Sequence, residues 1–219
     1  DNIICENFCY EGGISSFVEY LNKKKAVELV HPDIIHFSTV ADDDQATAEV
    51  AMQYNDSYNE LILSFANNIH TTDGGTHEEG FKRSLTRVMN DYARKYNLLK
   101  DSDKNLTGDD VREGLTVVIS IKVKDAQFEG QTKAKLGNTE ISGLVSNMMN
   151  DKLSTYLEEN PATARAIFDK ALAASRAREA ARKAKDMVRR KSALESAALP
   201  GKLADCQSKN PEESELYIV

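Results

Sequence analysis

The feature that most constrains the fold of this chain is a long segment without helix breakers near its carboxyl end. Asn160 and Pro161 form a strong helix start, because Asn is favoured at the N-cap and Pro at the first helical position. Neither Gly nor Pro follows before Pro200, and alanine, the best helix former, is abundant throughout. The pattern predicts a helix that continues to about Ser192, roughly 32 residues or about 48 Å long.

The same segment concentrates positive charge. Residues 162–202 contain 11 Lys and Arg against 4 Asp and Glu, although the whole chain of 219 residues has a net charge of -7. Phe168 and Leu172 are expected to anchor the first turns, after which alanine and basic residues dominate. Four cations, spaced by 4, 3 and 4 residues, share one helix face: Arg178, Arg182, Lys185 and Arg189. A basic segment on an acidic body favours a polyanionic partner, although most such faces are only solvated.

The preceding residues alternate between helical and strand-like patterns, which predicts an α/β body. Apolar residues at helical spacing predict helices over residues 14–25, 76–96 and 141–157, with a short one between 107 and 114. Strand-like runs over residues 34–41, 48–54 and 60–65 predict an antiparallel meander. Leu115–Val123 is β-branched and nearly continuous, as is typical of a central strand. Thr76 and Glu79 fit a capping box at the start of the second helix.

Several function classes find no support in the residues. No window approaches eighteen apolar residues and no signal peptide opens the chain, so no membrane partner is expected. The three cysteines, Cys5, Cys9 and Cys206, form an odd set that fits free thiols in a reducing cytoplasm. The four histidines show no zinc spacing with them, and neither glycine-rich nucleotide fingerprint occurs. No metal site is expected.

Seven short segments carry a resemblance to a known family. In chain order they are residues 10–13 (YEGG), 73–77 (DGGTH), 108–115 (GDDVREGL), 131–133 (QTK), 177–182 (AREAAR), 199–206 (LPGKLADC) and 215–217 (ELY). Together they resemble the B subunits of bacterial type IIA topoisomerases, the group that contains DNA gyrase and topoisomerase IV. The residues leave open which of the two is the nearer relative.

The resemblance implies the transducer domain of such a subunit. Residues 1–160 would form its α/β body, 161–198 a long connecting helix, and 199–219 a linker with the first strand of the TOPRIM domain. The implied fold is similar to domain two of ribosomal protein S five, with a left-handed βαβ crossover that the residues themselves do not reveal.

The resemblance also implies site residues. Lys133, with Gln131 and Thr132, would contact the γ-phosphate of an ATP bound in a preceding domain. The basic face of the long helix would line the cavity through which DNA passes. A family arginine that faces this cavity aligns with Lys82, and Arg83 is an alternative replacement.

For the parent protein the resemblance implies an ATP-hydrolysing DNA topoisomerase that uses ATP and Mg²⁺. Its partners would be DNA, the A subunit and a second B subunit in the ATP-bound state, and it would act on the chromosome in the cytoplasm. The catalytic residues would lie outside this chain, so the fragment alone is expected to be inactive. Three other interpretations remain open: a topoisomerase IV transducer, a non-enzymatic DNA-binding module that uses the basic helix, or a scaffold domain that mainly provides a dimer interface.

Overall fold

The computed structural model describes residues 11–41, 45–100, 103–195, 210 and 212, except that the side chains of residues 189–195 are not described. One compact unit ends at Arg176 and a second begins at Ala177. Cys5, Cys9, Cys206 and the strand expected near the end of residues 199–219 lie outside the described residues. None of the described helices is both long and apolar enough to span a bilayer.

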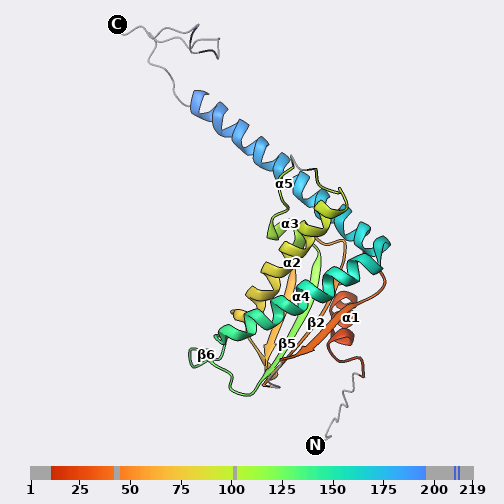
Figure 1. Ribbon diagram of the computed structural model, residues 1–219. Coiled ribbons are helices and arrows are strands. Elements are labelled where there is room, and N and C mark those ends of the chain that lie inside the picture. The colour runs from red at the N-terminus through yellow and green to blue at the C-terminus, as the bar shows by residue number, and fades with distance from the viewer. Residues whose placement is uncertain (1–10, 42–44, 101–102, 196–209, 211, 213–219) are drawn as a thin grey trace, which may run out of the picture. The chain divides into compact units, whose positions relative to one another are not determined.

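A five-stranded sheet forms the centre of the first unit, in the order β1-β2-β5-β3-β4 (Figure 1). Its strands are β1 (Ile35–Val40), β2 (Ala46–Tyr54), β3 (Leu61–Ala66), β4 (Ile69–His70) and β5 (Leu115–Val123). β5 pairs antiparallel with β2 and parallel with β3. It is buried along almost its whole length, as expected for the run of β-branched residues at the middle of a covered sheet.

The antiparallel meander that the sequence predicts is wrong at its second step. β1 and β2 do pair antiparallel, but β2 and β3 are separated by β5. The central position of the sheet is the most buried one, and β5 is the strand with the most continuous apolar sequence. β5 therefore occupies the centre and takes the place beside β2 that the meander would give to β3. β3 therefore reaches its neighbour through a long crossover that contains two helices.

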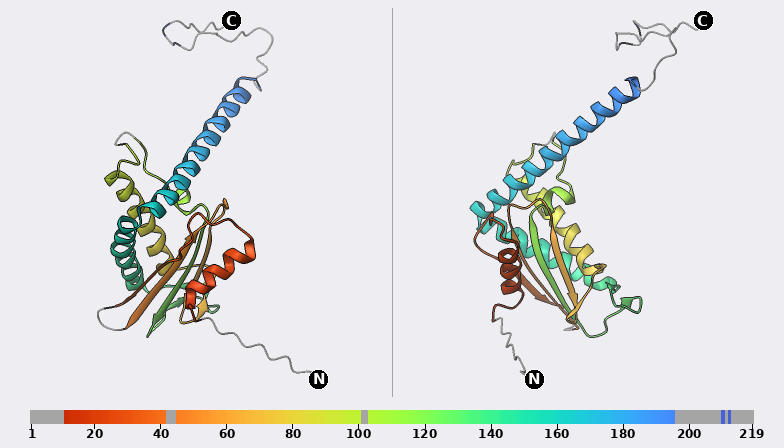
Figure 2. Two further views of the ribbon diagram at one scale, coloured as in Figure 1. Left: turned by 90° about the vertical axis from the view of Figure 1, so that its right-hand side faces the viewer. Right: turned by 180° about the vertical axis from the view of Figure 1, so that it is seen from behind.

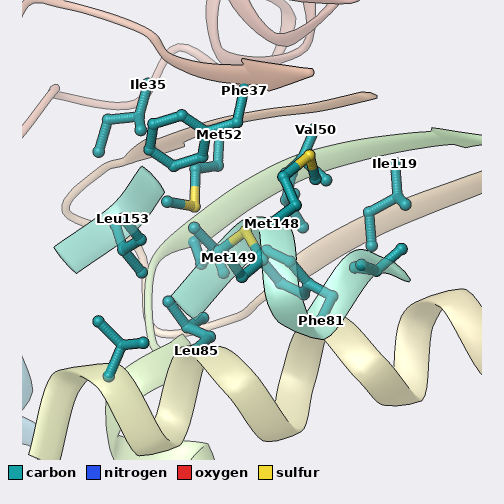
Figure 3. Packing of buried hydrophobic residues seen from close by; sticks show 14 of the residues in the cluster. Ile35, Phe37, Val50, Met52, Phe81, Leu85, Ile119, Met148, Met149 and Leu153 are labelled. Atoms are coloured by element: carbon teal, nitrogen blue, oxygen red, sulfur yellow. The ribbon is translucent and has the colours of Figure 1, made fainter. Parts of the chain in front are cut away.

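Helices cover both faces of the sheet (Figure 2). The larger core lies under α2 (Thr76–Lys95) and α4 (Thr139–Glu159), where Phe81 and Leu85 meet Met148, Met149 and Leu153 (Figure 3). α1 (Gly13–Lys25) covers the other face with a smaller cluster around Val18, Ala51 and Val118. The helices expected over residues 14–25, 76–96 and 141–157 are thus confirmed.

Of the two predictions of helix capping, one fails. Gly75, and not Thr76, is the N-cap residue of α2, and no side chain caps that end. The prediction at Asn160 holds: it directly precedes the helix that begins at Pro161, and its backbone carbonyl accepts from the N–H of Ala164 at 2.9 Å, while its side-chain amide donates to the Tyr156 carbonyl at 3.0 Å. The short helix α3 (Gly108–Arg112) has the capping box instead, formed by Thr107 and Asp110.

The long helix α5 extends from Pro161 to Glu195, close to its predicted bounds. Within the first unit its early turns are buried in the large core through Ala164, Ile167, Phe168 and Ala171. The Phe168 ring stacks on Tyr92 of α2, with centroids 5.1 Å apart and planes at 10°.

Candidate functional site

The segment Gln131–Lys133 forms the tip of a small hairpin that the sequence did not predict. β6 (Phe128–Glu129) and β7 (Lys135–Leu136) pair antiparallel, and the connecting residues turn back at the end of the body where α2 begins (Figure 1). Gly130 and Lys133 both have positive φ angles, 78° and 55°. All three residues at the tip are exposed, so their side chains are available to a ligand from outside this unit.

The two lysines of the hairpin have different surroundings. Lys135 pairs with Glu129 across the strands, with Nζ and Oε2 3.1 Å apart. The Lys133 ammonium instead lies 5.8 Å from the centre of the Phe128 ring. The Phe128 ring is partly buried, but Lys133 is exposed to water, so the contact gains only about 0.5–1 kcal/mol and Lys133 can leave this position at small cost.

The base of the hairpin is fixed by Asn138, which precedes α4 and is buried. Its side-chain oxygen accepts from the backbone N–H of Gln127 at 2.7 Å, and its amide donates to the carbonyl of Asp125 at 3.1 Å. The hairpin therefore has an exposed tip on an anchored base.

One side of the hairpin is docked on the Asp73-Gly74-Gly75 turn. The N–H of Asp73 donates to Ala134 at 3.0 Å, and the N–H of Leu136 donates to Gly74 at 3.1 Å. Gly75 forms a parallel bridge with Leu136, and a Cβ on Gly75 would lie 2.4 Å from the Leu136 oxygen. Two motifs that are almost 60 residues apart in the sequence thus form one backbone assembly.

A buried polar cluster supports this turn from below. The Thr71 hydroxyl lies 2.9 Å from the Ser64 carbonyl, 2.8 Å from the Ser64 hydroxyl and 3.1 Å from Nε2 of His77. The Ser64 hydroxyl also donates to Glu78, whose other oxygen pairs with Lys82 at 2.6 Å. The cluster joins β3, the turn and the first turns of α2 into one network.

His77 is fully buried in this cluster. Its Nε2 lies 3.1 Å from the Thr71 hydroxyl, which also donates to the Ser64 carbonyl. Desolvation lowers the pKa of His77 to about 4, against a smaller opposing effect of Glu78. The imidazole is therefore neutral at physiological pH, and its Nδ1 has no partner among the described residues.

Lys82 and Arg83 are neighbours on α2 but differ in their contacts. The Lys82 ammonium is already paired with Glu78. Arg83 is exposed, and its Nη2 contacts the neutral hydroxyls of Ser142 and Ser146 on α4 at 3.3 and 3.5 Å. Of the two, Arg83 keeps the less compensated positive charge.

The basic residues of the second unit lie on the later turns of α5. Arg178, Arg182 and Lys185 are exposed and, by their helical spacing, share one face. Lys183 pairs with Glu179 at 3.0 Å. The side chain of Arg189 lies outside the described residues.

Sequence reasoning found the tip residues and the glycine turn, but it missed Ser64, Thr71 and Asn138. These are ordinary polar residues, and only their burial reveals their role. Among the described residues, no group of three or more His, Cys, Asp or Glu side chains could hold a metal ion.

Comparison with known sequences identifies related proteins. The family model described as DNA gyrase B matches residues 13–187. The B subunit of DNA gyrase from Clostridium acetobutylicum is 59% identical over 214 residues, 98% of this chain and 33% of that protein. The protein of the same name from Halalkalibacterium halodurans is 56% identical with the same coverage. The chain thus spans about a third of the length of the curated relatives it matches.

Solved structures give a consistent result. The 43K ATPase domain of Thermus thermophilus gyrase B, in complex with an aminocoumarin, aligns with a TM-score of 0.73 and 39% identity, over 81% of this chain and 46% of that one. A topoisomerase IV ATP-binding domain of Francisella tularensis aligns with a TM-score of 0.62 and 26% identity, over 78% of this chain and 44% of that one.

Proposed function

The chain belongs to the DNA gyrase B family, and from this premise we propose that it is the transducer part of a gyrase B subunit. In this role it detects the γ-phosphate of ATP and couples ATP hydrolysis to DNA strand passage and supercoiling. The choice of gyrase over topoisomerase IV, which the residues left open, is supported by the family match and by the names of the most similar relatives.

The observation that carries the proposal is the exposed Lys133 at the tip of an anchored hairpin. A long flexible ammonium is a suitable point-charge partner for a terminal phosphate. Its resting contact with the Phe128 ring is weak, so a phosphate can attract it away. Contact in the ATP state and its loss after phosphate release give the differential binding that a switch requires. Gln131 and Thr132 would supply polar contacts beside it.

The basic face of α5 is the proposed surface for transported DNA. Arg178, Arg182 and Lys185 are exposed on it, and Arg189 continues the spacing. Arginine and lysine bind phosphates of any sequence, which suits a duplex that passes through without being read. On α2 we assign the corresponding role to Arg83, because the charge of Lys82 is compensated by Glu78.

The remaining parts of the proposal concern the full-length subunit. Its substrates would be ATP, accompanied by Mg²⁺, and DNA. Its partners would be the gyrase A subunit and a second B subunit, in the cytoplasm on the chromosome. The nucleotide and metal would be held mainly by residues outside this chain, so the chain alone should neither hydrolyse ATP nor cleave DNA.

Two finer features of the fold belong to the same proposal. We expect the crossover from β3 to β5 to be left-handed, as in domain two of ribosomal protein S five; the parallel pairing of these neighbouring strands is compatible with this. We also expect functional segments at 1–160, 161–198 and 199–219. An experimental structure of the full-length subunit would test both.

ATP turnover by the full-length subunit tests the role of the tip. Lys133→Ala removes a charge-assisted contact of about 1.5–3 kcal/mol, so turnover should fall roughly ten- to a hundredfold while nucleotide binding weakens only in part. Lys135→Ala is the matched control, because it removes a lysine of the same hairpin that is paired with Glu129. Wild-type turnover in Lys133→Ala would favour the alternative of a DNA-binding module that uses the basic helix.

A further inference from the structure

We propose that Gly75, with the buried Ser64, Thr71 and His77 and the partly buried Glu78, positions Lys133 for the γ-phosphate. This inference rests on the proposed function and assigns the residues that make it work. None of these residues would touch the nucleotide. They act through the backbone of β7, which continues directly from the Lys133 turn.

The contact between the turn and β7 is close and is made by backbone atoms. Two backbone hydrogen bonds, from Asp73 to Ala134 and from Leu136 to Gly74, connect the segments immediately after Lys133 with the turn. Gly75 has a φ of 141°, and its α-carbon faces the Leu136 backbone with no room for a side chain. A methyl group at this position must push β7 away, because backbone atoms cannot yield as a flexible side chain can.

The cluster determines where the turn itself lies. Thr71 is bonded through its backbone N–H and its hydroxyl to Ser64 on β3, and through the same hydroxyl to His77 on α2. Glu78 accepts from Ser64 and pairs with Lys82. The turn is thus held at both ends by buried hydrogen bonds, and the hairpin takes its position from it.

Two further supports hold the hairpin: the Leu136 side chain is buried in the large core, and Asn138 fixes the base at Asp125 and Gln127. The turn is the support whose hydrogen bonds lie nearest to Lys133, at Ala134. A displacement of β7 at the turn should therefore move Lys133. Misplacing a charged group by about 1 Å can cost up to about a hundredfold in the step it assists.

The experiment measures the preference of the full-length subunit for ATP over ADP, as the ratio of dissociation constants for ADP and a non-hydrolysable ATP analogue. Lys133→Ala should lower this preference about tenfold or more, because only the γ-phosphate contact is lost. Gly75→Ala should lower it about tenfold with ADP binding unchanged. The double variant should match Lys133→Ala alone, because a misplaced lysine and an absent one lose the same contact.

Gly137→Ala is the matched control. Gly137 lies at the end of the same hairpin and has ordinary space for a Cβ, the nearest atom being 3.5 Å away. The Gly137→Ala variant should therefore keep the wild-type preference for ATP over ADP. Thermal melting checks that each variant is folded. If Gly75→Ala does not fold, two variants of Thr71 test the positioning role. Thr71→Val should lower the preference for ATP over ADP, whereas Thr71→Ser, which keeps the hydroxyl, should retain the wild-type preference.

The outcomes separate the two ideas. If Lys133→Ala keeps the wild-type preference, the proposed function of the tip fails and this inference fails with it. If Lys133→Ala lowers the preference but Gly75→Ala and Thr71→Val behave like Gly137→Ala, only the positioning role is overturned. A strictly additive loss in the double variant would also overturn it.

Discussion

The two parts of helix α5 have the same secondary structure and very different surroundings. Up to Arg176 the helix places Ala164, Ile167, Phe168 and Ala171 in the core of the first unit. From residue 177 to residue 188 every side chain is exposed, and basic residues alternate with alanine. Among the described side chains of α5, tertiary burial therefore stabilises the early turns, while intrinsic propensity maintains the turns from 177 to 188.

One helix thus combines an anchor, its buried early turns, with a charged surface, its exposed later turns. The anchor needs apolar volume that matches its neighbours, as in the stack of Phe168 on Tyr92. The surface needs only a helical scaffold that displays cations at regular spacing. Changes in the two parts should therefore affect different properties: stability in the first, and DNA binding and local helicity in the second.

The largest effect is expected from Phe168→Ala. The ring is fully buried, so its removal should lower the free energy of unfolding by about 3–5 kcal/mol. The matched control is Met187→Ala in the exposed part, where the side chain is 61% exposed and the cost should stay within about 0.5 kcal/mol. Urea unfolding followed by circular dichroism measures both. Equal losses of unfolding free energy in the two variants would contradict the difference in burial between the two parts of α5.

Acid should destabilise the buried part selectively. Burial lowers the pKa of His77 to about 4 and also lowers that of His31. In the unfolded chain both histidines titrate near 6.5. Between this pH and the lower pKa of the folded state, the unfolded chain binds protons that the folded chain does not, so the free energy of unfolding falls as the pH falls. His77 alone should contribute a loss of about 2 kcal/mol between pH 7 and pH 5.

The measurement is the free energy of unfolding at the two pH values for the wild type and for His77→Gln, which should show a smaller loss. Residues 177–188 contain no histidine, so their local helicity should not follow this dependence. An unfolding free energy that is unchanged or higher at pH 5 would contradict the buried neutral state of His77.

DNA binding should depend on the exposed part. The chain should bind DNA weakly and without sequence preference, through about four to six phosphate contacts with a steep dependence on salt. Neutralising Arg178, Arg182 and Arg189 together should reduce the slope of log affinity against log salt by about 2–3. The control removes the same amount of charge from α1 by replacing Lys23, Lys24 and Lys25, and should leave the slope unchanged. Sequence-selective or salt-insensitive binding would contradict this account.

The smallest effect is expected from Ala180→Gly. Glycine in an exposed helix costs about 1 kcal/mol relative to alanine, and because Ala180 is exposed, loss of burial does not add to this cost. Hydrogen exchange should become faster over the neighbouring turns while global unfolding is unchanged. Ala164→Gly, in the buried part, is the contrast and should lower global stability by more. If Ala180→Gly lowered the free energy of global unfolding, the later turns of α5 would be stabilised by tertiary packing, contrary to this account.

The sequence predicted those features that depend on local pattern. The bounds of β5 and the courses of α1, α2, α4 and α5 follow from periodicity and β-branched composition. The position of β5 between β2 and β3 could not be predicted, because strand order depends on burial over the whole sheet. The capping role expected for Thr76 failed because Gly75, held against Leu136, occupies the N-cap position.

The candidate site shows the same limit. A resemblance identified Lys133 and the glycine turn separately, but their contact joins residues far apart in the sequence and depends on backbone geometry. Ser64 and Thr71 carry no sequence signal, since isolated hydroxyl residues are common on any surface. Their importance follows from complete burial and from hydrogen bonds that only the folded chain forms.

The supercoiling activity of the full-length subunit, assembled with the A subunit, tests the central claim most directly. We predict that Lys133→Ala severely reduces ATP-driven supercoiling while ATP-independent relaxation survives, because only the detection of ATP is lost. Lys135→Ala should retain both activities. Supercoiling by Lys133→Ala at the wild-type rate would contradict the assignment of this loop as the γ-phosphate sensor.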